Sequence, residues 1–136
     1  MFLVDANVLL DVSTDDPVWR PWSERALEDA LAEGRVSINP IIYAELAFDF
    51  PDSRTLDRWL RDLEVERLEL PYEAGFPAAR AYARYRRAGG ARRSPLPDFY
   101  IGAHAAVAGL TLISRDAGRY RTYFPSLRLL EPPLRT

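Results

Sequence analysis

The stretch that decides the fold lies at the start of the sequence, where residues 2–11 read Phe2-Leu-Val-Asp-Ala-Asn-Val-Leu-Leu-Asp11. Three apolar residues that end at a carboxylate are typical of a short buried strand, and a helix is expected directly after it, over residues 6–12. Strands of this kind belong to parallel sheets, in which ligands bind at the carboxyl ends of the strands. Asp5 is therefore expected at the edge of the sheet where ligands bind.

The rest of the sequence repeats this alternation of short apolar segments and helical patterns. Further strands are predicted at residues 36–38, 65–70, 110–114 and 127–130. Helices are predicted at residues 21–32, about 40–48, 53–63, 76–87, 98–108 and 117–124, several of them with an N-cap or a closing glycine. The alternation over 136 residues predicts one α/β domain spanning 1–136, with three layers and a central, mainly parallel sheet of four to five strands.

The composition restricts the chemistry that the protein can perform. The chain has no cysteine and one histidine, His104, and all 18 basic side chains are arginine. A disulfide scaffold, a zinc–thiolate site and thiol catalysis are thereby excluded, and a Ser-His-Asp triad is disfavoured. Any metal must be held mainly by oxygen ligands, which favours a hard cation.

The N-terminal residues do not resemble a signal peptide, because no basic residue precedes the apolar run and Asp5 follows it closely. The longest weakly polar stretch, residues 101–113, is too short to cross a bilayer. We therefore expect the protein in the cytoplasm, without contact to a membrane.

Four carboxylates fall where the predicted sheet presents the carboxyl ends of its strands. Asp5 follows the first strand, and Asp116 follows the fourth. Asp98 lies in the first turn of the helix that leads into the fourth strand, and Glu45 lies about one and a half turns into the helix after the second. Each aspartate alone could simply cap a helix or complement its dipole.

Glu45 is harder to explain as a structural residue. It shares a helical face with Ile41 and Phe48, and a carboxylate within an apolar stripe needs a partner or a cation. Two carboxylates ~5 Å apart at an effective dielectric of ~20 repel by about 3 kcal/mol, so a cluster of four favours a bound divalent ion. Mg²⁺ or Mn²⁺ suits oxygen-only ligands that leave waters in place.

Two polar residues close to these acids could either support the acidic site or serve only to cap a helix or form a turn. Asn7 could hold Asp5 or a metal-bound water, or it could merely cap the helix. Ser114 could bind phosphate or Asp116, although serine at a strand end often serves only the turn.

Three further residues are expected to lie outside the site. Asp11 and Asp49 are further along their helices and are expected to face solvent. His104 is 240° around its helix from Asp98, and we interpret it as a surface or packing residue.

The net charge of −2 conceals a basic segment, since residues 78–97 carry six arginines and no acid. Arg80, Arg84 and Arg87 form one face of the predicted helix, with two tyrosines, Tyr82 and Tyr85, interleaved. These residues could bind RNA phosphates and stack on bases, or the helix could be a solvated one whose tyrosines pack on the core. The candidate RNA-binding residues are Arg80, Arg84, Arg87, Arg92, Arg93 and Arg115.

Five segments of the sequence, taken in order, resemble the PIN domain, and more narrowly the VapC toxins of bacterial type II toxin–antitoxin systems. The resemblance covers essentially the whole chain and rests on residues 2–11, Ile42-Tyr-Ala-Glu-Leu46, Pro97-Asp98 with the helix after it, Leu112-Ile-Ser-Arg-Asp116, and residues 120–130. It implies a parallel sheet and an Mg²⁺- or Mn²⁺-dependent endoribonuclease. The acidic site that it implies consists of Asp5, Glu45, Asp98 and Asp116.

The resemblance also implies partners. They are an RNA substrate, a second copy in a homodimer, and a VapB-type antitoxin whose C-terminal segment enters the active-site groove. Some members of the family carry an additional acid a few residues after the last aspartate, and residues 118–124 offer none. A second bound metal is therefore disfavoured.

Alternative functions differ in how well the sequence supports them. Response-regulator receivers and haloacid-dehalogenase-type phosphatases also place acids at strand ends, but both mechanisms need a lysine, which this chain lacks. A PIN nuclease of RNA processing without an antitoxin remains open. So does a non-catalytic module whose acids receive an arginine from a partner.

Overall fold

The computed structural model describes residues 1–90 and 96–133, in which the strands form one parallel sheet. The strands are β1 (Phe2–Val4), β2 (Val36–Ile38), β3 (Val65–Arg67), β4 (Thr111–Ile113) and β5 (Leu129–Leu130). They lie in the order β3-β2-β1-β4-β5, and each neighbouring pair is parallel. The predicted α/β class and mainly parallel sheet of four to five strands are confirmed.

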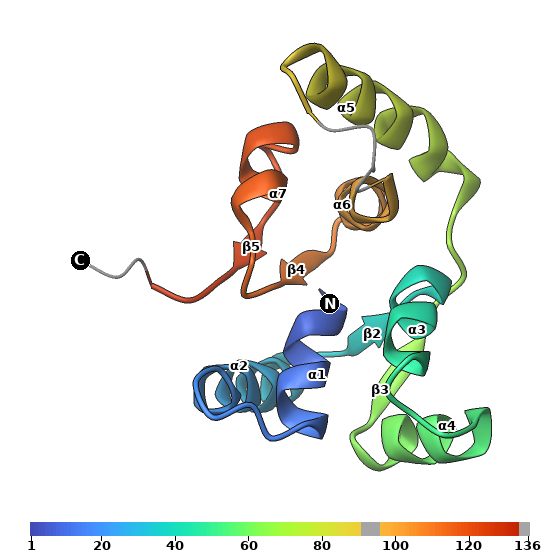
Figure 1. Cartoon of the computed structure of the whole chain (residues 1–136), viewed down its shortest axis with the longest axis vertical. Helices are drawn as coiled ribbons and strands as arrows, with labels where there is room; N and C mark the ends of the chain where they lie inside the picture. The colour runs from blue at the N-terminus through green and yellow to red at the C-terminus, as the bar shows by residue number, and fades with distance from the viewer. Residues whose placement is uncertain (91–95, 134–136) are drawn as a thin grey trace.

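Helices cover both faces of this sheet. Within the described residues they are α1 (Ala6–Ser13), α2 (Arg20–Glu33), α3 (Pro40–Ala47), α4 (Ser53–Asp62), α5 (Gly75–Arg87), α6 (Leu96–Ala108) and α7 (Gly118–Tyr123), with a 3₁₀ turn at Tyr72–Ala74. Figure 1 shows α5 and α6 on one side of the row of strands and α1 and α2 on the other. This arrangement is the predicted three-layer α/β/α architecture. None of these helices is long and apolar enough to span a membrane.

The core is built around the central strand β1. Leu3 and Val4 are fully buried, as are Leu112 on one neighbouring strand and Ile38 on the other. Burying a side chain of this size stabilises the fold by about 1.5–3 kcal/mol. Because β1 lies in the middle of the sheet, the residue that follows it, Asp5, comes to the centre of the edge formed by the carboxyl ends of the strands.

Local signals in the sequence place most helix boundaries correctly. The Asn39 side chain accepts a hydrogen bond from the Ile42 amide at 3.0 Å, and Asp52 caps α4 in the same way. Gly89 and Gly109 adopt φ values of 92° and 68° just after α5 and α6, a backbone conformation that glycine tolerates best.

The two outer strands are shorter than predicted. Only residues 65–67 of the predicted strand 65–70 form β3, and only residues 129–130 of the predicted strand 127–130 form β5. Each lies at an edge of the sheet and has a partner on one side, so its length is limited by the three residues of its neighbour.

An aromatic cluster joins α5 to α6 and α7. The rings of Tyr82 and Tyr85 lie 5.9 and 5.5 Å from that of Phe99, which is fully buried, and Tyr123 closes the cluster 5.4 Å from Phe99. The tyrosines of α5 thus take the packing role that the sequence left open as the alternative to base stacking.

Candidate active site

Four acidic side chains from four separate segments line one cavity of about 330 Å³ at the carboxyl ends of the strands. They are Asp5, Glu45, Asp98 and Asp116, the acids that the sequence singled out. Asp5 follows β1, Glu45 lies on α3, Asp98 is in the first turn of α6, and Asp116 lies between β4 and α7. The parallel topology therefore gathers residues that are far apart in the sequence.

Asp5 is the most buried of these acids, with 5% of its surface exposed. One carboxylate oxygen accepts a hydrogen bond from the Ala6 amide at 2.8 Å and so caps α1. The other accepts hydrogen bonds from the hydroxyls of Ser114, at 3.0 Å, and Tyr120, at 3.1 Å. Burial and the charge of Asp98 nevertheless raise the pKa of Asp5 to about 6.

Glu45 carries a buried oxygen whose hydrogen-bonding capacity is unmet. Its Oε1 atom has no hydrogen-bond partner among the described residues. Burial, together with the charges of Asp5 and Asp98, raises the pKa of Glu45 to about 7. A buried carboxylate oxygen without a donor is costly, and this cost is removed if a cation or a proton is present.

One residue expected beside Glu45 in the apolar stripe of its helix lies outside the core. Phe48, the C-cap of α3, is 91% exposed. The buried apolar residues of α3 are Ile42 and Leu46. Glu45 is therefore half-buried at the rim of the core and lines the cavity.

Asp98 has a cationic partner within the cavity. Arg119 donates a hydrogen bond from Nη1 to Asp98 Oδ2 at 2.8 Å, and its guanidinium lies 5.4 Å from the centre of the Tyr85 ring. Burial raises the pKa of Asp98, and Arg119 opposes this effect. Neither Arg119 nor Tyr120 was predicted as a site residue, although their positions three and four residues after Asp116 place them on the helix that leaves the site.

Asn7 and Ser114 support the acids through a chain of hydrogen bonds. The Ser114 hydroxyl donates to Asp5 and accepts from the Asn7 side-chain amide and the Asp116 backbone amide, both at 3.2 Å. The Asn7 carbonyl oxygen accepts from the Arg115 backbone amide at 3.3 Å. Asn7 thus acts on Asp5 through Ser114, and Ser114 ties the turn before Asp116 to β1.

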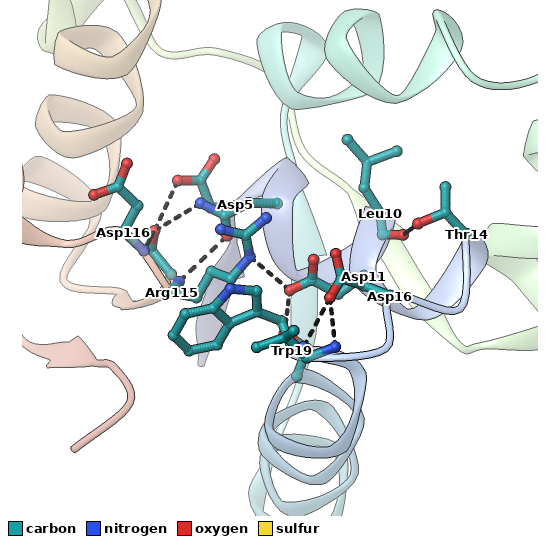
Figure 2. Close-up of polar contacts among 12 residues, drawn as sticks. Asp5, Leu10, Asp11, Thr14, Asp16, Trp19, Arg115 and Asp116 are labelled. Atoms are coloured by element: carbon teal, nitrogen blue, oxygen red, sulfur yellow. Dashed lines mark hydrogen bonds and ion pairs between the residues drawn. The ribbon is translucent and has the colours of Figure 1, made fainter. Parts of the chain in front are cut away.

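Asp11 corrects a prediction, since it is buried and does not face solvent. It is 2% exposed and accepts hydrogen bonds from Ser23 at 2.7 Å and from Arg115 Nε at 2.8 Å (Figure 2). Asp49 is exposed, as predicted. His104 is a packing residue and not a surface one, because it is 3% exposed with its Nδ1 atom 3.1 Å from the Asn39 side-chain nitrogen.

The candidate RNA-binding arginines fall into three groups. Arg80, Arg84 and Arg87 are exposed on α5, and Arg84 donates a hydrogen bond to the Tyr123 carbonyl oxygen at 3.0 Å. Arg115 is partly exposed and forms an ion pair with Asp11 at 2.8 Å. Two others, Arg92 and Arg93, lie outside the described residues.

The donor set of the cavity fits a divalent cation, but it does not form a complete ligand sphere. Within residues 1–90 and 96–133, no three His, Cys, Asp or Glu side chains are arranged so that they could hold a metal ion. All four acidic donors are carboxylates, one of their oxygens is buried without a partner, and the pKa values of Asp5, Glu45 and Asp98 are raised. Uncompensated oxygen donors of this kind suit Mg²⁺ or Mn²⁺ with part of its coordination supplied by water.

Comparison with known proteins gives one family and a consistent set of folds. The family model of the PIN domain matches residues 2–125. No curated protein matches this sequence. Among solved structures, the chain is similar to a chain of VapBC2 from Rickettsia felis bound to a DNA fragment from its promoter, with 17% identity, a TM-score of 0.74, and coverage of 97% of this chain and 98% of that chain.

Two further solved structures give the same result. A chain of VapBC-1 from nontypeable Haemophilus influenzae has 16% identity and a TM-score of 0.72, with 96% of both chains covered. A chain of a toxin–antitoxin complex from Klebsiella pneumoniae has 20% identity and a TM-score of 0.69, with 93% of this chain and 95% of that chain covered. At these identities the likeness is one of fold.

Proposed function

The chain belongs to the PIN domain family, whose members are nucleases, and from that premise we propose that it is a metal-dependent endoribonuclease that acts as the toxin of a toxin–antitoxin pair in the cytoplasm. The observation that carries the proposal is the convergence of Asp5, Glu45, Asp98 and Asp116 on one cavity with part of their negative charge uncompensated. The similarity to chains of toxin–antitoxin complexes supports the role as a toxin.

PIN nucleases generally use divalent metals, and we assign Mg²⁺ or Mn²⁺ to this cavity. Asp5, Asp98 and Asp116 would hold the ion, and Glu45 would bind it directly or through water. When bound, the cation lowers the pKa of a water ligand and neutralises the scissile phosphate, which promotes hydrolysis of the phosphodiester bond.

The protein's own residues prepare these ligands. Ser114 and Tyr120 donate hydrogen bonds to the same Asp5 oxygen and fix the orientation of the carboxylate. Burial raises the pKa of Tyr120 well above its usual value, so its hydroxyl remains a donor at neutral pH. Glu45, with a pKa of about 7, holds a proton part of the time when no cation compensates it. Its affinity for a cation therefore rises with pH.

RNA would reach the cavity along the basic face of α5. This helix packs against α6, which carries Asp98, and Arg84 bonds to the last residue of α7. We assign Arg80, Arg84 and Arg87 to phosphate contacts, with Arg92 and Arg93 extending the same basic segment of the sequence. Binding of RNA is then expected to weaken steeply between low and physiological salt. An affinity that stays flat over this range would contradict the assignment.

The partners we assign are a VapB-type antitoxin, which would block the cavity, and a second copy of the chain. A PIN nuclease of RNA processing would share the cavity but not the antitoxin. Co-expression with any small protein encoded immediately upstream would separate the two functions, since only an antitoxin would suppress toxicity and co-purify with the chain. A non-catalytic module would show neither metal binding nor cleavage.

The decisive test compares Asp5→Asn with the wild type in cleavage of RNA in the presence of Mn²⁺. We expect the wild type to leave 5′-phosphate and 3′-hydroxyl ends and Asp5→Asn to show no cleavage, although circular dichroism reports an intact fold. Asp49→Asn is the matched control, because Asp49 is exposed and should be dispensable. Cleavage by Asp5→Asn at the wild-type rate would refute the proposed site.

A further inference from the structure

An ion pair outside the cavity, formed by a buried acid and a partly exposed arginine, connects three segments of the chain. Asp11, on α1, is 2% exposed and receives hydrogen bonds from Ser23 on α2 and from Arg115, in the turn after β4. The Arg115 Nε to Asp11 Oδ2 distance is 2.8 Å. A carboxylate buried this deeply depends on such partners, because an unpaired buried charge is strongly destabilising.

Arg115 is held on several sides. Its guanidinium lies 5.4 Å from the centre of the Trp19 ring, and its backbone amide donates to Asn7 Oδ1 at 3.3 Å. Trp19 is itself positioned by Asp16, whose side chain accepts a hydrogen bond from the Trp19 amide at 2.8 Å. Figure 2 shows the Arg115 side chain between the Trp19 indole and Asp11, next to the backbone that leads to Asp116.

Asp116 depends on this turn for its position. Its side chain is exposed, and no described residue forms a hydrogen bond or ion pair with its carboxylate. Its backbone amide donates to Ser114 Oγ at 3.2 Å. The preceding residue, Arg115, donates from its backbone amide to Asn7 Oδ1 and from its side chain to Asp11. The place of the carboxylate at the cavity is therefore set by the backbone, which is held by Ser114, by Asn7 and by the Arg115 side chain through Asp11.

We infer that the Asp11–Arg115 ion pair is a positioning device that holds Asp116 at the cavity for the divalent cation. The inference rests on the proposed function and assigns to Arg115 a role different from binding RNA. Residues that orient metal ligands from behind typically change metal affinity by 10–100-fold when they are removed.

Removing the Arg115 side chain has two possible effects on the affinity for the cation, and they are opposite in sign. The loss of a positive charge beside an acidic cavity should by itself tighten cation binding. The loss of a device that positions Asp116 should weaken it. The sign of the change in affinity therefore separates the two effects.

The experiment measures Mn²⁺ affinity by calorimetry for the full chain and for Arg115→Met, Asp116→Asn and the double variant. We expect Arg115→Met to bind Mn²⁺ about tenfold more weakly than the wild type. In the Asp116→Asn background the same change should have no effect or should tighten binding, because the ligand that Arg115 positions is already lost. An unchanged or tighter affinity in the single variant, or an equal loss in both backgrounds, overturns the inference.

Two further variants guard against a loss of folding. Asp11→Asn retains a side chain that can accept from Ser23 and Arg115, and we expect it to lose affinity in the same direction but by less, again only when Asp116 is present. Arg20→Met is the matched control, since Arg20 forms ion pairs with Asp15 and Glu24 away from the cavity and should leave the affinity unchanged. If thermal unfolding shows that Arg115→Met does not fold, the inference is tested by the Mn²⁺ affinity of Asp11→Asn, measured once with Asp116 present and once in the Asp116→Asn background. A wild-type chain that binds no Mn²⁺ at all refutes the proposed function itself, whereas a wild type that binds with variants that do not differ refutes only the inference.

Discussion

Two sets of acids in the protein differ in how their charge is compensated. Asp11 has Ser23 and Arg115 as partners, and Asp57, which is part-buried, receives the Tyr43 hydroxyl at 2.7 Å.

Among the residues that line the cavity, one arginine, Arg119, forms an ion pair, and its partner is Asp98. Burial there raises the pKa of Asp5 to about 6 and that of Glu45 to about 7, and one Glu45 oxygen has no partner among the described residues. A buried acid that has its partners needs no further charge, whereas acids left without compensation are candidates for binding a ligand that supplies the missing charge.

The largest effect that can test this comparison is the pH dependence of stability in the absence of metal. The pKa of Asp5 is about 6 in the folded protein against 3.8 for an aspartate in water, so the folded state binds this proton more tightly than the unfolded state does. Its contribution to the free energy of unfolding is full below about pH 4 and is lost as the pH rises to about 6. The loss amounts to about 3 kcal/mol, and Glu45 extends the decline to about pH 7.

Urea unfolding between pH 4 and pH 8, with and without Mn²⁺, checks this prediction. Added Mn²⁺ should restore stability at pH 7 and above, because the cation replaces the protons. Stability that rises between pH 5 and pH 7 in the metal-free protein would show that the cavity is as well compensated as Asp11, and the comparison would fail.

Glu45→Gln gives the next largest effect. The amide removes the charge that burial and the neighbouring acids disfavour, so the metal-free protein should be more stable by about 2 kcal/mol at pH 8. Thermal unfolding of the metal-free variants measures this gain, and Asp49→Asn, on an exposed acid just after the same helix, should show none. Destabilisation by Glu45→Gln would mean that Glu45 has a partner in the folded state.

Arg119→Gln gives the smallest effect and sharpens the contrast with Arg115. Arg119 forms an ion pair with Asp98, with 2.8 Å between Nη1 and Oδ2, and would compete with a cation for that carboxylate. A partly exposed ion pair contributes up to about 1 kcal/mol, so its removal should tighten Mn²⁺ binding by up to about fivefold. The control is Arg121→Gln, which removes the same charge from the same helix at a residue paired with Glu131. Equal changes in the two variants would show that only net charge matters.

The sequence predicted the acids of the site because their positions follow from topology. Asp5 and Asp116 come after strands, and parallel strands bring their carboxyl ends to one edge of the sheet. The proximity of the two acids could therefore be predicted without knowing how any side chain packs. Glu45 and Asp98 lie within two turns of the start of helices whose boundaries were marked by Asn39-Pro40 and by Pro97.

The errors arose where the outcome depends on how elements pack. Asp11 is buried because α2 returns across α1 and because Arg115, 104 positions away, reaches it, and neither contact has a local signal. Helical periodicity predicted Phe48 in an apolar stripe, but this residue at the end of α3 is 91% exposed, and periodicity does not show how far the core extends along a helix. The partners Arg119 and Tyr120 were missed because a short helix has too few residues to show which face it presents.

The parallel order of the strands also sets the time at which the cavity can exist. The hydrogen bond that completes the environment of Asp5 comes from Tyr120, 115 positions later in the sequence. Ribosomes add about 5–20 residues per second, so the first acid emerges several seconds before the last parts of its surroundings. A growing chain therefore has no assembled cavity until β4 and the helix that carries Tyr120 have been made.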